Sequence, residues 1–527
     1  MDLLQISLIA CLFAAVSSAN AQPCAQKIGR APSYIACACN TTYCDQIPNV
    51  TTLKNGQFAV LETDEDGKRG ELKLGNIGEK LTVKTGNEKI IIRLDPKTTY
   101  QEILGFGAAF TDSVGVNLRS LSNELQQSIL EQYFGKNGIG YTLGRVPIAS
   151  TDFSWGEYSY LDKEDDFDLR TFNLTKEDFD LKISFIKRAE QLLGRPLNLV
   201  ASPWSAPAWM KTNGKMIHGG RLSGRCPGKY YETWGKYYIR FFEEYHKNGL
   251  DFWGLTTLNE PSSGRIPFYP WQSMYMSPED LRSFINVYLG PNMKANQVTK
   301  DVKIMVNDDN VHNLPDYVQN VFDDSETAKY VDGIAIHWYH NDFSNLERLR
   351  ETNKRWPNKF VLSTEACAGA ELFDKGPVLG MWQRGVRYVR DIIDTLSRNA
   401  IGWIDWNLCL NMEGGPTFVD NRVDSPILVD AEKGEYYKQP MFYAMAHFSK
   451  FVTPGSHRTH HDVAGLPEKS KLGSIAFTTP EGKRVLVLNN ENDFKAFDIQ
   501  IKDPAGSESI YYTIERNSFV TIVWNKH

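Results

Sequence analysis

The sequence lacks several features that define common classes of protein. Its 58 Lys and Arg residues are outnumbered by 64 Asp and Glu residues, which gives a formal net charge of −6. Without an excess of positive charge there is no electrostatic basis for binding nucleic acid. Neither an internal repeat nor a low-complexity linker is visible. The 527 residues exceed what one hydrophobic core usually serves, so we expect one large domain with a smaller companion.

Long apolar runs are also missing after the first residues. Leu3 to Val16 is almost unbroken apolar sequence, but it is too short for a comfortable membrane span. Ala19-Asn20-Ala21 then fits the small-x-small cleavage pattern, so residues 1–21 are predicted to be a signal peptide. Its start departs from the usual pattern, with Asp2 and no Lys or Arg. We therefore expect a lysosomal or secreted protein.

Cysteine is scarce and unevenly placed. Three residues are scattered, Cys226, Cys367 and Cys409, whereas four crowd the start of the predicted mature chain: Cys24, Cys37, Cys39 and Cys44. The crowding predicts two disulfides in an oxidising compartment. A zinc site is the competing interpretation, but there is no CxxC pair and no histidine nearby. Sequons that fit the secretory pathway begin at Asn40, Asn49 and Asn173.

Short apolar, β-rich runs recur along the chain, separated by amphipathic segments such as NELQQSILEQYF. The runs begin at Glu102, Tyr141, Leu197, Phe252, Val302, Gly333, Lys359 and Ile401. Near-continuous apolar strands that alternate with helices predict a parallel sheet covered by helices. Eight such units indicate an α/β fold of the (β/α)₈ barrel type.

Polar side chains gather at the carboxyl ends of these runs. They are Asp112, Arg145 with Asp152, Trp204, Asn259 with Glu260, Asn307 with Asp308, His337 with Tyr339, Glu365, and residues 405–407. Each has a structural explanation when taken alone; Asp112, for example, fits a helix N-cap. In a barrel, however, these ends converge on one mouth, where active sites are built. The convergence predicts an enzyme.

After the eighth run, strand-like segments such as RVLVLNNE and SFVTIVWN alternate with turn sequences. This pattern predicts antiparallel strands that form a β-sandwich. Residues from about Gly56 to Arg93 show a similar pattern, so both chain ends are expected to build it. The predicted divisions are a disulfide-rich segment with a small β-sheet at 22–50, completed by about 408–440; a sandwich at 51–100 plus 445–527; and a catalytic barrel at 101–407.

Two glutamates suit the hydrolysis of a glycoside with retention. That reaction needs a carboxylic acid to protonate the leaving oxygen and a carboxylate to attack C1, about 5–5.5 Å apart. Glu260 ends the fourth run, in LNEP, and Glu365 ends the seventh, in STEA. We expect strands four and seven to face each other, with Glu260 as acid and Glu365 as nucleophile. Asn259 is placed to bind a sugar 2-hydroxyl, and Arg145 to hold Glu365 ionised.

These residues stand in motifs that closely resemble the lysosomal acid β-glucosidases, or glucosylceramidases, of glycoside hydrolase family 30. The motifs span almost the whole mature chain and include GFGAAFTD, ASPWSAPAWMKTNG, TLNEPSSG, AIHWYHNDF, STEACAGA and KQPMFYAMAHFSKF. Several are long and rare. The resemblance therefore implies hydrolysis of glucosylceramide to glucose and ceramide, with no metal or other cofactor.

The resemblance also implies roles for particular residues. It places five around the glucosyl ring: Asp152, Trp204, Asn259, Trp406 and Asn421. Others would line the cleft or support it: Arg145, His337, Tyr339, Cys367, Tyr269 and Trp271. It further implies the disulfides Cys24–Cys37 and Cys39–Cys44, and a small three-stranded sheet at the N-terminus. The expected partners are acidic lipid membranes, by peripheral contact, and a saposin-type activator.

Three alternatives stay open. Loops set the preference for the aglycone, and those at 215–228 and 265–271 match the family less well than the strand ends do. The same mechanism would therefore suit a soluble β-glucoside, a β-xyloside or a β-1,6-glucan. A silent carbohydrate-binding protein is a second alternative, although both glutamates are present. A metal site at His457, His460 and His461 is a third, but the stretch is polar and a solvated loop is the better explanation.

Overall fold

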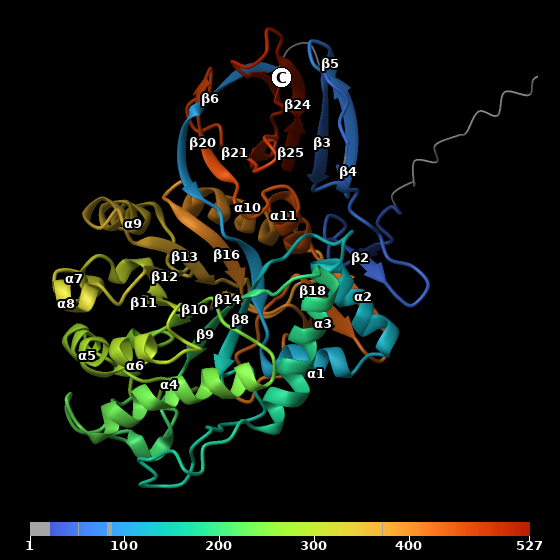
Figure 1. Ribbon diagram of the computed structural model, residues 1–527. Coiled ribbons are helices and arrows are strands. Elements are labelled where there is room, and N and C mark those ends of the chain that lie inside the picture. Colours follow the sequence, from blue (N-terminus) through green and yellow to red (C-terminus); the bar gives the residue numbers. More distant parts are fainter. Residues whose placement is uncertain (1–21, 51, 82–86, 372, 527) are drawn as a thin grey trace, which may run out of the picture.

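The computed structural model describes residues 22–50, 52–81, 87–371 and 373–526 (Figure 1). The predicted signal peptide lies outside these ranges. Within them the chain forms a closed barrel, a ten-stranded sheet, a five-stranded sheet and a two-stranded hairpin. Within these residues, no helix is both long and apolar enough to cross a bilayer.

Eight strands close into the barrel, which confirms the predicted fold class. Neighbouring strands are parallel. Inside, apolar side chains such as Leu143, Val200 and Ile404 form one buried cluster. Each strand overlaps one of the predicted runs, although β11 continues two residues past its run and β16 begins one residue before its run. The strands are β7 (Gly105–Ala109), β8 (Leu143–Ile148), β9 (Asn198–Pro203), β10 (Gly254–Thr256), β11 (Lys303–Asn310), β12 (Gly333–His337), β13 (Phe360–Glu365) and β16 (Ala400–Asp405).

Helices lie between successive strands and surround the barrel (Figure 1). They are α1 (Asp112–Arg119), α2 (Asn123–Phe134), α3 (Ser184–Leu193), α4 (Lys229–Lys247), α5 (Pro278–Phe284), α6 (Gly290–Ala295), α7 (Asp316–Phe322), α8 (Ser325–Ala328), α9 (Phe343–Arg355) and α10 (Trp382–Leu396). The N-cap of α1 is Thr111, whose hydroxyl accepts from the Val114 N–H. The N-cap alternative for Asp112 is therefore wrong by one residue; its buried carboxylate accepts from Ser154 instead.

The ten-stranded sheet folds into a sandwich built from both ends of the chain (Figure 1). Its strands are β3 (Gln57–Asp64), β4 (Arg69–Asn76), β5 (Lys80–Leu81), β6 (Glu88–Glu102), β20 (His457–Ala464), β21 (Leu472–Thr478), β22 (Arg484–Asn490), β23 (Phe497–Lys502), β24 (Ile510–Ile514) and β25 (Ser518–Trp524). Alternate residues of β25 serve two cores. Val520 and Ile522 enter the sandwich interior, whereas Phe519 and Val523 join the barrel core.

A completely buried helix, α11 (Pro440–Ser449), joins the barrel to the sandwich. The ring of Phe448 lies 6.1 Å from that of Phe106 on β7. His447 points the other way, with its Nε2 2.8 Å from the Thr63 hydroxyl and its Nδ1 2.9 Å from the Thr521 hydroxyl. Burial lowers the pKa of His447 to about 3, so the ring is neutral where it meets the sandwich. The two parts therefore share one packed interface.

The small sheet has five strands, so the three-stranded count that the family resemblance implied is wrong. The N-terminal segment supplies two strands, and the chain after the barrel supplies three, two of which pair in parallel. The strands are β1 (Gln26–Ile28), β2 (Ile35–Cys39), β17 (Leu410–Asn411), β18 (Ile427–Asp430) and β19 (Glu435–Lys438). Each strand has only two to five residues, too few to show a clear alternation in the sequence.

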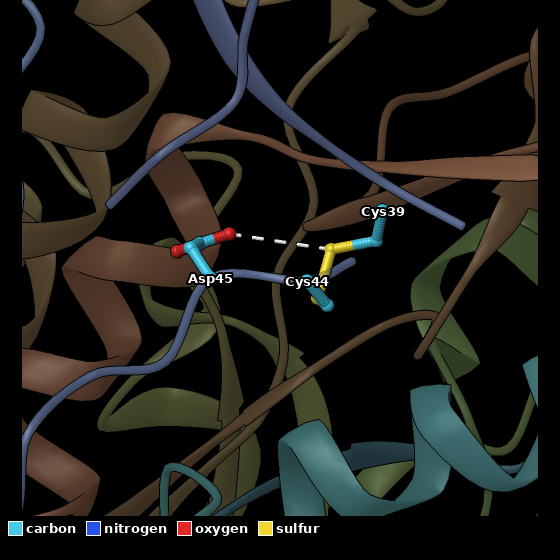
Figure 2. A group of neighbouring side chains, drawn as sticks. All are labelled: Cys39, Cys44 and Asp45. Atoms are coloured by element: carbon cyan, nitrogen blue, oxygen red, sulfur yellow. Dashed lines mark hydrogen bonds between the residues drawn. A yellow bond between two sulfur atoms is a disulfide. The ribbon is translucent and has the colours of Figure 1, made fainter. Parts of the chain in front are cut away.

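Two disulfides, Cys24–Cys37 and Cys39–Cys44, are present as the resemblance implied. Beside the second, a carboxylate oxygen of Asp45 lies 4.0 Å from the Cys39 sulfur (Figure 2). The zinc interpretation requires thiolates, whereas these sulfurs are bonded to each other. Asp45 is instead paired with the buried Lys438 of β19 at 2.9 Å, so it ties the N-terminal segment to the small sheet.

The packing of α11 leads to a prediction about stability. Phe448→Ala should lower the free energy of unfolding by about 3–5 kcal/mol, because it removes a completely buried ring between helix and barrel. Denaturant unfolding measures this difference. The matched control is Phe494→Ala, since that ring is 90% exposed; its effect should stay within about 0.5 kcal/mol. Equal effects of the two substitutions would contradict this role of α11.

Candidate active site

A cleft of about 370 Å³ opens at the carboxyl ends of the barrel strands. The structure brings eleven of the sequence-predicted site residues to its walls: Asp152, Trp204, Asn259, Glu260, Tyr269, Trp271, Tyr339, Glu365, Cys367, Trp406 and Asn421. Arg145 and His337 lie beneath the cleft, completely buried and bonded to the residues above. The cleft is also lined by residues not singled out from the sequence: Asn310, His340, Ala370, Glu371 and Val423.

Glu365 is the last residue of β13 and is only 6% exposed. The Arg145 guanidinium donates to one carboxylate oxygen from 2.5 Å. The Tyr339 hydroxyl donates to the other oxygen from 2.8 Å. Both oxygens are therefore held in place, and the Arg145 contact is the one anticipated from the sequence.

Glu260 lies four residues beyond the end of β10, at a left-handed φ of +39°. Its backbone N–H donates to the Asp308 carbonyl from 2.9 Å. The side chain is 16% exposed, and one oxygen lies 3.1 Å from His337 Nδ1. The Tyr269 hydroxyl approaches the other oxygen at 3.5 Å. The loop after β10, rather than the strand itself, therefore presents this carboxylate to the cleft.

The two glutamates approach each other closely. One carboxylate oxygen from each, together with a nitrogen of His337, lies within 4.8 Å of the others. Their strands, β10 and β13, are separated by two strands on one side of the barrel and by four on the other, so they face each other obliquely across it. Because Glu260 lies in the loop after β10, its carboxylate extends beyond the strand toward Glu365. This separation suits retention, because inverting enzymes keep their carboxyl groups about 6.5–9.5 Å apart.

His337 is buried between carboxylates. Its Nε2 lies 3.2 Å from an Asp308 oxygen, and its Nδ1 lies 3.8 Å from Glu365 in addition to the Glu260 contact. Burial opposes its charge, but Glu365, Asp308 and Glu260 together raise the pKa of His337 to about 10. The imidazolium therefore donates from both nitrogens. A histidine protonated on both nitrogens has no lone pair for a metal ion, so Glu260, His337 and Glu365 lie near one another as an ion-paired group.

Asp152 and Asn421 stand on the wall where the resemblance places the glucosyl ring. The Asn421 amide donates to Asp152 from 2.7 Å, a contact that the sequence did not suggest. Asp152 is 3% exposed. Burial raises its pKa to about 7, although the Asn421 bond acts in the opposite direction.

Aromatic rings form the floor and the rim of the cleft. Trp204 and Trp406 stack with centroids 5.1 Å apart, and the Arg145 guanidinium lies 4.8 Å from the Trp204 ring. At the rim, Tyr269 and Trp271 meet edge to face at 4.6 Å. Both tryptophans of the floor are almost fully buried, so they support the site as well as line it.

Comparison with known proteins shows similarity over nearly the whole chain. The model of the glycosyl hydrolase family 30 TIM-barrel domain matches residues 103–452, and that of the family 30 beta sandwich domain matches residues 455–522. The chain is 43% identical to a Caenorhabditis elegans protein whose name assigns it provisionally to the glucosylceramidases, over 96% of each chain. It is 41% identical to the lysosomal acid glucosylceramidase of Mus musculus, over 94% of each chain.

More distant relatives extend the range of named substrates. An endo-1,6-beta-D-glucanase of Neurospora crassa is 27% identical over 82% of this chain and 88% of its own. Among solved structures, SrfJ from Salmonella typhimurium superposes with a TM-score of 0.79 at 29% identity, covering 89% of this chain and all of the other.

The raised pKa of Asp152 leads to a prediction about stability and pH. Between about pH 4 and 7, an unfolded Asp has lost its proton while Asp152 in the folded state keeps it, so this carboxyl lowers stability as pH rises. Asn at this position does not titrate. Asp152→Asn should therefore gain stability relative to the wild type over that range, by up to about 4 kcal/mol. Urea unfolding at a series of pH values measures this.

The control is Asp316→Asn on α7, whose side chain is 76% exposed. Its stability relative to the wild type should not follow this trend. A constant difference between Asp152→Asn and the wild type from pH 4 to 7 would show that Asp152 does not titrate in this way.

Proposed function

Because the chain belongs to glycosyl hydrolase family 30, we propose that it is a retaining β-glucosidase that hydrolyses glucosylceramide to glucose and ceramide. The observation that carries the proposal is the pair of glutamates, whose carboxylate oxygens lie within 4.8 Å at the mouth of the barrel. The name of the mouse relative supports the choice of glucosylceramide.

In the first step of the reaction, the Glu365 carboxylate attacks C1 of the glucosyl group. Glu260 donates its proton to the glycosidic oxygen, the C1–O bond breaks and ceramide leaves as the alcohol. A glucosyl ester of Glu365 remains. In the second step, Glu260 removes a proton from water, whose oxygen attacks C1 and releases Glu365 and glucose. Two inversions at C1 give net retention.

The groups around this pair have complementary tasks in the proposal. Arg145 donates to the side-chain amide oxygen of Asn259 from 2.8 Å, which directs the amide nitrogen of Asn259 toward a sugar 2-hydroxyl. That hydrogen bond strengthens in the transition state. Asp152 and Asn421 bind other sugar hydroxyls, while Trp204 and Trp406 provide apolar walls. Tyr339 and Cys367 complete the floor, where the Tyr339 hydroxyl lies 3.3 Å from the Cys367 sulfur.

The position of the enzyme at a membrane is part of the proposal. Exposed apolar side chains flank the cleft on two loops: Ile266 and Phe268 are 51% and 82% exposed, and Phe373 is 99% exposed. They adjoin the cleft-lining residues Tyr269 and Glu371. These side chains suit peripheral insertion into acidic lipid, where ceramide resides, with a saposin-type activator as helper. Lysosomal delivery fits the name of the mouse relative and the two disulfides.

A β-1,6-glucan is the second candidate substrate, because a relative at 27% identity is named as an endo-1,6-beta-D-glucanase. The catalytic steps would be unchanged, and the aglycone would be a further glucose unit. Activity on this soluble glucan without activity on glucosylceramide in vesicles would favour the second candidate.

Replacing each glutamate tests the assignment of roles. Glu260→Gln should lower kcat about 10²–10⁴-fold on a fluorogenic β-glucoside, and azide should restore turnover with formation of a β-glucosyl azide. Glu365→Gln should abolish activity without such rescue, because no nucleophile remains. The control is Glu347→Gln on α9, which lies outside the cleft and should retain activity. Full activity of Glu365→Gln would overturn the mechanism.

The membrane contact has its own test. The double variant Phe268→Ser and Phe373→Ser should bind phosphatidylserine vesicles on the order of 10-fold or more weakly, because each ring loses apolar burial in the lipid. Vesicle flotation measures binding, and hydrolysis of the soluble glucoside should change little. Phe494→Ser, on the sandwich and 90% exposed, is the matched control. Equal binding by all three proteins would place the membrane contact elsewhere.

A further inference from the structure

Asp308 occupies an irregular position near the carboxyl end of β11. On β11, Asn307 pairs with Ala335 and Asp309 with Ile336, which leaves Asp308 as an extra residue in a β-bulge. Asn307 and Asp308 are both left-handed, with φ of +78° and +45°, a conformation that residues other than glycine rarely adopt. Bulges of this kind often redirect a side chain next to an active site.

The Asp308 carboxylate is completely buried and accepts from four strands. One oxygen lies 3.2 Å from His337 Nε2 on β12 and accepts from the Thr364 hydroxyl on β13 at 2.7 Å. The other accepts from Arg145 Nη2 on β8 at 2.8 Å and from the Thr256 hydroxyl on β10 at 2.6 Å. This carboxylate therefore lies at the centre of the hydrogen bonds beneath the cleft.

Two of these partners contact the catalytic glutamates. Arg145 uses one nitrogen for Asp308 and another for Glu365. His337 similarly places one ring nitrogen against Asp308 and the other against Glu260. The Asp308 main chain adds a third link, since its carbonyl accepts from the Glu260 N–H.

Asp308 also supplies negative charge to the two buried cations beneath the cleft. Arg145 and His337 are buried cations, and the Asp308 carboxylate contacts both, at 2.8 and 3.2 Å. Burial opposes ionisation of Asp308, but Arg145 and His337 nevertheless hold its pKa well below the usual range. It is therefore ionised throughout the working pH range and balances one of the two cations.

We propose that Asp308 is a positioning residue that sets the placement of both catalytic glutamates, Glu365 through Arg145, and Glu260 through His337 and the bulged backbone. This inference rests on the proposed β-glucosidase function, because it assigns Asp308 a part in both chemical steps. It adds a residue that does not line the cleft and that substrate never touches.

The test uses Asp308→Asn in the full-length protein, since Asn keeps the shape of the side chain and tolerates the left-handed backbone. We expect kcat to fall on the order of 10²-fold, the scale of a small misplacement of reacting groups. KM should change by less than about threefold. The loss should appear on glucosides with good and with poor leaving groups, because both glutamates shift.

The pH profile separates positioning from a merely structural role. Asp308 faces Arg145 and His337, and His337 also faces Glu260, Glu365 and Asp309. Removing one negative charge lets the groups that face it lose protons more readily. The alkaline limb of kcat/KM should therefore move to lower pH in Asp308→Asn.

The matched control is Asp178→Asn. Asp178 is also completely buried, paired with Lys182 at 3.4 Å, and accepts from the Tyr160 and Tyr245 hydroxyls. This control should lose stability while keeping the wild-type pH profile and kcat. If Asp308→Asn behaves in the same way, Asp308 is only structural and the proposal is overturned.

If Asp308→Asn does not fold, a second variant tests the positioning role of Asp308. Thr256→Val removes one neutral donor to Asp308 and leaves both ion pairs, so kcat should fall roughly 3- to 10-fold at unchanged KM. An unchanged kcat in a folded Thr256→Val protein would overturn the proposal. A folded wild-type protein that hydrolyses no β-glucoside would instead overturn the proposed function, so the two failures are distinct.

Discussion

Buried charge is the constraint on which the catalytic end of the barrel depends. The side chains of Arg145 and Asp308 have no exposed surface, and an unpaired charge in such a place would be very costly. Each charge is tolerated only when its partners on neighbouring strands are in register. The same contacts that satisfy these charges fix Glu365 and Glu260, so the fold and the reactive geometry have a common physical cause. The sandwich and α11 contribute from the other side, by holding the barrel core together.

Much of the architecture follows from patterns that are local in the sequence. Each barrel strand overlaps one of the eight apolar runs, because strands covered by helices must be apolar on both faces. The sandwich is recognisable for another reason: from β20 to β25, strands follow one another with turns between them and no helices. The short strands of the small sheet carry no period over two to five residues, so their number rested on the family resemblance alone, which implied three.

The site was less predictable than the fold. Strand ends indicate which side chains reach the mouth, so the sequence could suggest the contact between Arg145 and Glu365. It could not suggest the bond between Asn421 and Asp152, which joins residues 269 positions apart. Asp308 stood among the polar strand ends without a role, because its direction depends on a bulge that no local pattern indicates. The reach of Glu260 likewise depends on a loop conformation beyond β10.

We propose that two glutamates, whose nearest carboxylate oxygens lie within 4.8 Å of each other, hydrolyse a β-glucoside with retention. The most direct measurement is the anomeric configuration of the glucose first released, followed by proton NMR before mutarotation. We expect β-glucose to appear first, because the glucosyl ester of Glu365 imposes two inversions at C1. Initial release of α-glucose would show that water attacks directly, and would contradict the role given to Glu365.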